Sequence, residues 1–202
     1  MKRDLAGGRV QFLGSFPTEV PVVGLPEIAV AGRSNVGKSS CLNRLVGVRR
    51  AARVSNTPGR TQAINLFQVQ DRYLLADLPG YGFARVPEAV QQGWKGLVEG
   101  YLGGDRDLRL VLLLIDPRRD AGGMDADLLW SLREARLPVL VVATKLDKLK
   151  RLKGRAALAR LAKAYGLGPQ ELLGFSALKG TGLDDLHRAI DKAVKGKTPR
   201  PA

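Results

Sequence analysis

The topology of this chain follows from one glycine-rich segment, Gly32-Arg33-Ser34-Asn35-Val36-Gly37-Lys38-Ser39. It fits the pattern G-x-x-x-x-G-K-[ST] of a phosphate-binding loop. An apolar run, residues 28–31, precedes it, and a segment with helical spacing of apolar residues, 37–47, follows it. This is the strand-to-helix context that the pattern requires. Backbone N–H groups of such a turn, with the N-terminal end of the helix, bind phosphate oxygens.

Two side chains of this segment carry chemistry of their own. Lys38 is expected to reach the β- and γ-phosphates of a nucleotide as a point charge. The hydroxyl of Ser39 is expected to ligate Mg²⁺, which prefers oxygen ligands. The residues expected to contact the nucleotide here are Gly32, Arg33, Ser34, Asn35, Val36, Gly37, Lys38, Ser39 and Ser40. The pattern alone does not distinguish ATP from GTP, or a kinase from a hydrolase.

Apolar strands and helical patterns alternate along the chain. Strands are expected at 28–31, 63–69, 73–76, 110–115, 139–143 and 172–175, and helices at 37–47, 87–102, 124–135, 155–165 and 183–194. The alternation predicts an α/β fold, a mostly parallel six-stranded sheet with helices on both faces. Only three residues separate 63–69 from 73–76, so these two form a hairpin, which makes one antiparallel edge strand. Ligands of such folds bind beyond the carboxyl ends of the strands.

A second motif, Asp77-Leu78-Pro79-Gly80, follows the strand at 73–76. The carboxylate of Asp77 can hold Mg²⁺, usually through water. Gly80 can bring its backbone N–H against the γ-phosphate because it has no side chain to obstruct the approach. Between the two motifs lies a polar, turn-rich segment, residues 55–62. A switch loop needs a hydroxyl for the Mg²⁺ shell, and spacing does not choose between Thr57 and Thr61.

A third motif, Thr144-Lys145-Leu146-Asp147, follows the apolar run at 139–143. Asp147 can accept hydrogen bonds from N1–H and the 2-amino group of guanine, a donor pair that adenine lacks. The aliphatic stem of Lys145 can cover one face of the base. Ser176-Ala177-Leu178 follows the last expected strand, and the N–H of Ala177 can donate to the guanine O6. Together these motifs predict guanine selectivity.

The motifs in this order resemble those of the TRAFAC-type GTPases, and most closely those of the EngB family. The segments that carry the resemblance are the phosphate loop with Ser40, Thr57-Pro58-Gly59-Arg60-Thr61-Gln62, Ile64-Asn65 with Phe67, and Asp77-Leu78-Pro79-Gly80-Tyr81-Gly82. The resemblance runs from about residue 22 to residue 194. It implies a Ras-like P-loop GTPase domain over residues 22–195, between an N-terminal segment, 1–21, and a short basic tail, 196–202.

The resemblance also implies a ligand set. GTP or GDP would be bound with Mg²⁺, held by Ser39, Thr61 and, through water, Asp77. It makes Thr61 rather than Thr57 the switch threonine, and it gives catalytic parts to Lys38, Thr61 and Gly80. The nucleotide-binding set then adds Gly59, Arg60, Thr61, Gln62 and Ala63 to the residues of the other motifs, which are Asp77, Leu78, Pro79, Gly80, Thr144, Lys145, Leu146, Asp147, Ser176, Ala177 and Leu178.

Three positions qualify the expected chemistry. Tyr81 stands where Ras-like proteins carry the glutamine that orients the attacking water, so slow intrinsic hydrolysis is expected. An asparagine at the position of Asn35 is associated in this superfamily with a K⁺ ion that replaces an arginine finger; the alternative is a side chain that stabilises the loop. Thr144 stands where many GTPases carry Asn, a change expected to weaken the bracing of the phosphate loop.

Net charge suggests the partner. The formal charge is +14, from 33 Lys and Arg against 19 Asp and Glu, which favours a polyanion such as RNA. The cations gather at Lys145, Lys148, Lys150, Arg151, Lys153, Arg155, Arg160 and Lys163, and at Arg49, Arg50 and Arg53. The EngB family is implicated in assembly of the large ribosomal subunit, so the resemblance implies that subunit or its rRNA as partner, in a protein needed for normal growth and division. The alternative is a nucleotide-switched binding module at the division site or membrane.

The remaining composition excludes several classes of protein. Cys41 is the one cysteine, so no internal disulfide is possible and nothing requires an oxidising compartment. The N-terminus does not lead into a long apolar run, as a signal peptide would, and the longest apolar stretch, 110–115, is too short to span a bilayer. A cytoplasmic location without membrane binding is therefore expected, and we expect the protein to be a monomer.

Overall fold

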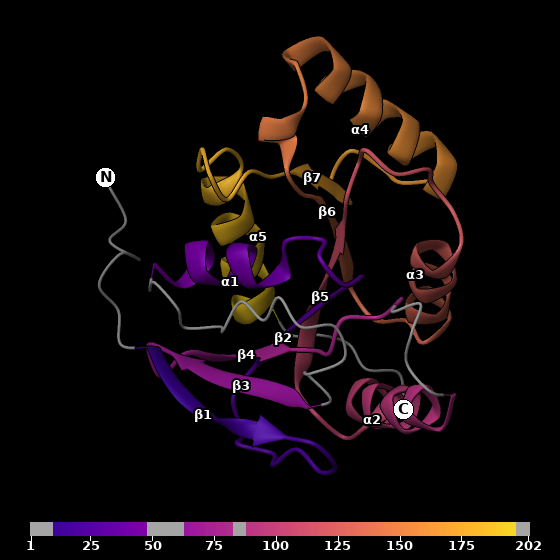
Figure 1. Ribbon diagram of the computed structural model, residues 1–202. Coiled ribbons are helices and arrows are strands. Elements are labelled where there is room, and N and C mark those ends of the chain that lie inside the picture. Colours follow the sequence, from indigo (N-terminus) through magenta and orange to yellow (C-terminus); the bar gives the residue numbers. More distant parts are fainter. Residues whose placement is uncertain (1–9, 48–62, 83–87, 197–202) are drawn as a thin grey trace.

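The computed structural model describes residues 10–47, 63–82 and 88–196, and it arranges them as a seven-stranded sheet between two layers of helices (Figure 1). The strands are β1 (Val10–Phe16), β2 (Glu27–Gly32), β3 (Ile64–Val69), β4 (Tyr73–Asp77), β5 (Leu108–Ile115), β6 (Val139–Ala143) and β7 (Leu172–Gly174). The helices are α1 (Lys38–Val46), α2 (Glu88–Gly103), α3 (Met124–Glu134), α4 (Arg151–Tyr165) and α5 (Leu183–Lys195), with a short 3₁₀ turn, η1 (Leu146–Lys148). The predicted α/β class is confirmed.

The sheet has the order β1-β3-β4-β2-β5-β6-β7. Strand β3 runs against both its neighbours, and the pairs from β4 through β2, β5 and β6 to β7 are parallel. The predicted hairpin joins β3 and β4. Its backbone is left-handed at Gln70 and Asp71, with φ of 52° at each, and the amide of Arg72 donates to the carbonyl oxygen of Val69 at 3.0 Å.

The predicted count of six strands, with the antiparallel strand at the edge, is wrong. Strand β1 lies within the expected N-terminal segment, pairs with β3, and takes the edge position. Its pattern gave no signal because most of its side chains are half-buried or exposed and its register shifts between Phe12 and Gly14. Phe12 packs on Phe67 of β3 with ring centroids 5.3 Å apart, although its side chain stays 55% exposed.

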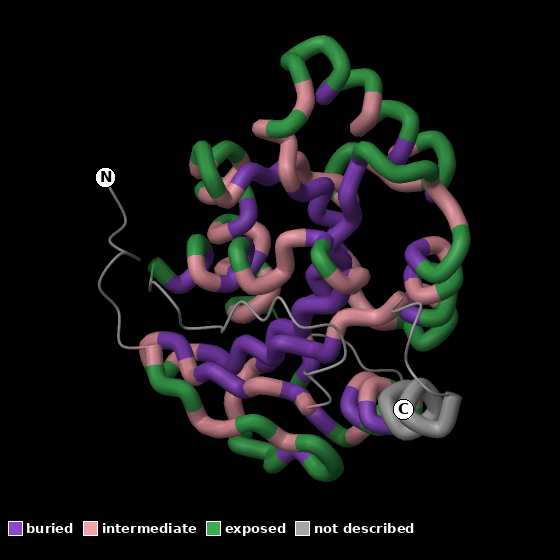
Figure 2. The backbone as a smooth tube through the Cα atoms, in the orientation of Figure 1, coloured by how far each residue is buried: buried purple, intermediate pink, exposed green. Residues whose placement is uncertain are grey.

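Each face of the sheet buries its own core. In β5, Leu110, Leu112 and Leu114 point into the core under α1 and α5, and the alternate residues point into the core under α2, α3 and α4. Successive side chains of a strand alternate between faces, so a strand covered on both sides reads as one continuous apolar run. The central strands are accordingly buried along their length (Figure 2).

A buried ionic cluster closes the amino end of the sheet. Glu27, at the start of β2, accepts hydrogen bonds from the Tyr101 hydroxyl at 2.6 Å and from Nε of Arg106 at 2.9 Å. The same guanidinium donates to the carbonyl oxygens of Val20 at 2.9 Å and Pro21 at 2.7 Å. Burial, with the Glu27 carboxylate, raises the pKa of Tyr101. We call these five residues the amino-end cluster.

Candidate functional site

The predicted motifs meet at the opposite, carboxyl end of the sheet. The phosphate loop follows β2, Asp77 ends β4, the base loop follows β6, and Ser176 follows β7. These four strands are parallel, so their carboxyl ends lie along one edge. The structure therefore gathers the predicted site at one rim of the sheet, as the strand rule requires.

Lys38 and Asp77 are in direct contact. The ammonium of Lys38, the first residue of α1, forms an ion pair with Oδ1 of Asp77. The other carboxylate oxygen lies 3.4 Å from Nδ2 of Asn65 in β3. Asp77 is 5% exposed, so its charge is held in a largely desolvated position. The residue expected at the phosphates and the carboxylate expected near Mg²⁺ thus occupy one small region.

The phosphate loop is a tight turn held by its own backbone. Asn35 and Gly37 adopt left-handed conformations, with φ of 61° and 106°, and the value at Gly37 strongly favours glycine. The amide of Val36 donates to the carbonyl oxygen of Arg33 at 3.1 Å. The Val36 side chain is 3% exposed and packs in the core, which anchors the loop. Ser39 is half-buried and Ser40 is exposed in the first turn of α1.

The turn after β4 lies against the phosphate loop. The amide and hydroxyl of Ser34 both lie within hydrogen-bond distance of the Tyr81 carbonyl oxygen, at 2.9 and 3.3 Å. A Cβ on Gly80 would stand 3.2–3.4 Å from Ser34, so only glycine fits this approach without displacement. Leu78 and Pro79 are buried, so only their backbone can face a ligand.

The phenol of Tyr81 points to α3 and makes a hydrogen bond there. Its hydroxyl donates to Oδ1 of Asp125 at 2.8 Å. Burial, reinforced by the charge and hydrogen bond of Asp125, raises the pKa of Tyr81, and burial likewise raises the pKa of Asp125. The phenol is therefore a neutral donor that secures the turn to α3.

Thr144 braces the phosphate loop. Its Oγ1 lies 2.7 Å from the carbonyl oxygen of Val36 and 3.2 Å from that of Ile115. The hydroxyl has one hydrogen to donate, whereas an asparagine amide has two. Thr144 thus keeps a hydrogen bond that holds the phosphate loop, but with one donor hydrogen where asparagine would have two.

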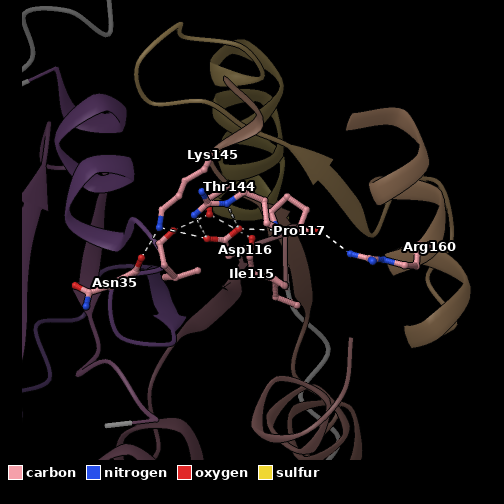
Figure 3. Close-up of polar contacts among 9 residues, drawn as sticks. Asn35, Ile115, Asp116, Pro117, Thr144, Lys145 and Arg160 are labelled. Atoms are coloured by element: carbon pink, nitrogen blue, oxygen red, sulfur yellow. Dashed lines mark hydrogen bonds and ion pairs between the residues drawn. The ribbon is translucent and has the colours of Figure 1, made fainter. Parts of the chain in front are cut away.

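Lys145 crosses over the phosphate loop (Figure 3). Its backbone is left-handed, with φ of 55°, and its Nζ donates to the carbonyl oxygen of Asn35 at 2.5 Å. The stem passes close to Gly37, where an added Cβ would stand 3.6 Å from Cε of Lys145. The side-chain amide of Asn35 points away from this contact in Figure 3 and is exposed.

Asp147 and Ser176 join the two base-reading segments. The hydroxyl of Ser176 donates to Oδ1 of Asp147 at 2.7 Å, and the amide of Lys179 donates to that hydroxyl oxygen at 3.1 Å. Leu146 packs in the same place, with its Cδ1 2.6 Å from where a Cβ on Gly174 would stand. Ala177 is half-buried and Leu178 is 77% exposed. The carboxylate expected to recognise guanine is thus held in one orientation.

Sequence reasoning missed Asp116, the residue after β5. Its carboxylate is 4% exposed, bonds to Arg118, and lies 3.3 Å from Nζ of Lys145. Burial alone would raise the pKa of Asp116, but hydrogen bonds from Arg118 and the charges of Lys145 and Arg118 outweigh it and lower the pKa to about 2. Its place directly after a buried parallel strand was the signal that could have found it.

The predicted switch residues Thr57, Gly59, Arg60, Thr61 and Gln62 lie outside the described residues. Ala63 is described and half-buried, immediately before β3. Within the described ranges no group of three or more His, Cys, Asp or Glu side chains could hold a metal ion. The oxygen donors of Ser39 and Asp77 suit Mg²⁺, which commonly takes only one or two protein ligands and completes its shell with phosphate and water.

Comparisons with known proteins agree with this geometry. A family model described as "50S ribosome-binding GTPase" matches residues 27–145. The "probable GTP-binding protein EngB" of Gemmatimonas aurantiaca is 45% identical over 170 residues, which cover 84% of this chain and 83% of that protein. The protein of the same name from Geobacter sulfurreducens is 44% identical over 187 residues, 92% of this chain and 91% of that protein.

The chain belongs to the EngB family of GTP-binding proteins. A crystal structure of a probable EngB GTP-binding protein superimposes with a TM-score of 0.69 and 26% identity, over 84% of this chain and 98% of that one. Members of this GTPase family bind GTP and GDP and typically use Mg²⁺. The resemblance drawn from the sequence motifs is thereby confirmed.

The basic residues of this EngB-family chain divide into two kinds. Arg160 donates to the carbonyl oxygens of Pro117 at 2.8 Å and Arg119 at 3.1 Å, and Lys145 is bound to the phosphate loop. The remaining cations of the segment, like Arg160, are exposed. They are Lys148 and Lys150, just before α4, and Arg151, Lys153, Arg155 and Lys163 within it, and we call these six the α4 basic face. Arg49, Arg50 and Arg53 lie outside the described residues. In the described part of the chain, no helix is both long and apolar enough to cross a bilayer.

Proposed function

We propose that this protein is a slow GTPase that acts as an assembly factor for the large ribosomal subunit, docking with GTP bound and leaving after hydrolysis. The observation that carries the nucleotide part is the convergence of Lys38, Asp77 and the Asp147–Ser176 pair at one rim of the sheet. The family match carries the reaction.

Asp147 would select guanine. One of its oxygens accepts from Ser176, which fixes the carboxylate so that it can accept from N1–H and the 2-amino group of the base. A base without that donor pair leaves the carboxylate unpaired at a cost in affinity. The N–H of Ala177 would donate to O6, and the stem of Lys145 would cover the ring.

Lys38 and the loop amides would neutralise charge that develops on the phosphates, with the amide of Gly80 at the γ-phosphate. Mg²⁺, held by Ser39, by Asp77 through water, and by Thr61, would supply further charge neutralisation there. Asn35 is proposed as a K⁺ ligand, and its exposed amide supports that role. Replacing K⁺ with Na⁺ should lower the hydrolysis rate. An unchanged rate would refute the proposed K⁺ site at Asn35.

Slow intrinsic hydrolysis is supported by the phenol of Tyr81. Its hydroxyl bonds to Asp125 and so does not substitute for a glutamine amide that orients water. A partner that completes the site should therefore accelerate the reaction. Single-turnover rates with and without large-subunit particles test this, and equal rates would refute it.

The α4 basic face supports an RNA-rich partner. No acidic residue lies between Asp147 and Glu171, so the charged side chains exposed on α4 are all positive. Cations on such a surface neutralise phosphates and release counterions, which gives salt-sensitive affinity. The family model's own description names a 50S ribosome-binding GTPase, and the proposal extends that partner to this chain.

Co-sedimentation with large-subunit particles tests the partner. We expect binding with a non-hydrolysable GTP analogue and release with GDP. Lys153→Glu with Arg155→Glu should weaken it and flatten its salt dependence, whereas the matched control, Lys192→Glu with Lys195→Glu on α5, should not. No co-sedimentation in either nucleotide would refute the assembly role and favour a switched binding module at the division site or membrane.

A further inference from the structure

Asp116 lies between the base loop and the phosphate loop without belonging to either motif. Its Oδ2 is 3.3 Å from Nζ of Lys145, and that nitrogen also donates to the Asn35 carbonyl oxygen of the phosphate loop. Figure 3 shows the ammonium reaching across from the β6 loop to both acceptors. Three loops, which follow β2, β5 and β6, therefore share one cation.

We propose that Asp116 is a positioning residue for guanine-nucleotide binding, which holds the ammonium of Lys145 on the phosphate loop so that the stem of Lys145 is fixed where the base lies. The inference rests on the nucleotide site proposed above. Asp116 would touch no part of the nucleotide and would act through Lys145.

The conformation of Lys145 supports this role. A left-handed backbone is uncommon for a residue with a side chain, and the surroundings must impose it. A lysine stem also has many rotamers, and fixing its far end removes that freedom before a ligand binds. The carbonyl oxygen of Asn35 supplies one acceptor for an ammonium with three hydrogens, and Asp116 supplies a second acceptor together with opposite charge.

Asp116 is itself held in place. The backbone amide of Arg118 donates to Oδ1 at 3.1 Å, and its guanidinium donates to Oδ1 at 2.9 Å and to Oδ2 at 2.7 Å. The Arg118 side chain is 41% exposed, whereas that of Asp116 is 4% exposed. The carboxylate thus faces Lys145 from a fixed, buried position, while its partner on the other side reaches solvent.

A double-mutant cycle tests the inference. Affinity for a fluorescent GDP analogue and for a non-hydrolysable GTP analogue would be measured in wild type, Asp116→Asn, Lys145→Met and the double variant. Methionine keeps an apolar stem but removes the ammonium. We expect Asp116→Asn to weaken both ligands by about tenfold, and to weaken neither further in the Lys145→Met background.

Two further variants help to separate positioning from general damage. Asp107→Asn makes the same substitution beside the other end of β5, at a carboxylate whose partner is Arg109, and should leave affinity unchanged. Arg118→Ala removes the other partner of Asp116 and should cost less affinity than Asp116→Asn. Thermal unfolding without nucleotide would establish that every variant is folded.

The outcomes are distinct. A merely structural role for Asp116 would lower affinity equally in both Lys145 backgrounds, and that result would overturn the inference. So would an unchanged affinity in Asp116→Asn when Asp147→Asn still abolishes guanine preference. If Asp147→Asn also leaves guanine preference unchanged, the proposed nucleotide site itself is refuted.

Discussion

The two ends of the sheet use charged groups in opposite ways. At the amino end, Glu27, Tyr101 and Arg106 satisfy one another in a buried cluster that also fastens the carbonyl oxygens of residues 20 and 21. At the carboxyl end, Lys38 at the start of α1, Asp77 at the end of β4 and Asp147 in η1 present groups that suit phosphate, metal and base. Strand β2 connects the two ends, since it begins at Glu27 of the amino-end cluster and leads into the phosphate loop at the carboxyl end. One end therefore stabilises the fold, and the other is available for ligands.

The largest effect should come from opening the amino-end cluster. Arg106→Ala leaves Glu27 as a buried charge without its partner, which should lower the free energy of unfolding by about 3–5 kcal/mol. Urea denaturation at neutral pH measures it. Arg188→Ala, whose side chain and Asp185 partner are 66% and 59% exposed, is the control and should change stability by about 1 kcal/mol or less. Similar losses of unfolding free energy in Arg106→Ala and Arg188→Ala would contradict the stabilising role given to the amino-end cluster.

At the carboxyl end the matching change should affect binding and spare the fold. Asp147→Asn should weaken GDP binding by about a hundredfold and shift preference toward xanthine nucleotides, because an amide cannot accept from both guanine donors. Unfolding without nucleotide should change by about 1 kcal/mol or less, since Asp147 is only half-buried. Competition binding with GDP and XDP checks it. Intact guanine selectivity would remove Asp147 from the site.

The lowered pKa of Asp116, at the carboxyl end of the sheet, predicts that the free energy of unfolding depends on pH. Its folded-state pKa of about 2 lies below the ordinary value of 3.8, so its ionised form stabilises the fold. That contribution is fully present above about pH 4 and is lost as the pH falls from about 4 to 2; it should amount to about 1–2 kcal/mol. The difference in unfolding free energy between wild type and Asp116→Asn should therefore shrink across this window. A constant difference would contradict the assignment.

The smallest effect should follow from Tyr81→Phe. Loss of the hydrogen bond to Asp125 should lower the free energy of unfolding by about 1 kcal/mol. The rate of GTP hydrolysis should stay within about threefold, because the phenol points to α3 and takes no part in proton transfer. Chemical denaturation and single-turnover kinetics measure the two quantities. A hundredfold loss of rate would show that the Tyr81 hydroxyl takes part in hydrolysis, contrary to this prediction.

The sequence predicted the carboxyl end well because short motifs there are constrained by backbone geometry. Gly37, Gly80 and the residue directly after each parallel strand are fixed by close approach or by strand direction, and both are readable from local spacing. Local spacing therefore locates the segments that carry Lys38, Asp77 and Asp147. The helices and central strands followed from apolar periodicity, with ends off by a few residues.

Long-range pairing was not readable in this way. Glu27 and Arg106 are 79 positions apart, and Tyr81 and Asp125 are 44 apart, and each stands in a segment whose local pattern does not identify its partner. Strand β1 was not predicted because it lacks a regular alternation of buried and exposed residues. Its register shifts between Phe12 and Gly14, and its side chains are half-buried or exposed. Asp116 escaped because no motif contains it, although its position after β5 follows the same rule as the others.

The bridge between Arg33 and Tyr81 continues the pairing of β2 with β4 beyond the ends of both strands. Ser34 has its amide acceptor on that neighbouring turn, and Gly80 leaves the space that Ser34 fills. If the phosphate loop of another NTPase replaced this one without residues 80–81, two contacts would be at risk. The amide at position 34 could lose its acceptor, the Tyr81 carbonyl oxygen, and the incoming residue could clash with the turn at Gly80. The two segments are best exchanged as one cassette.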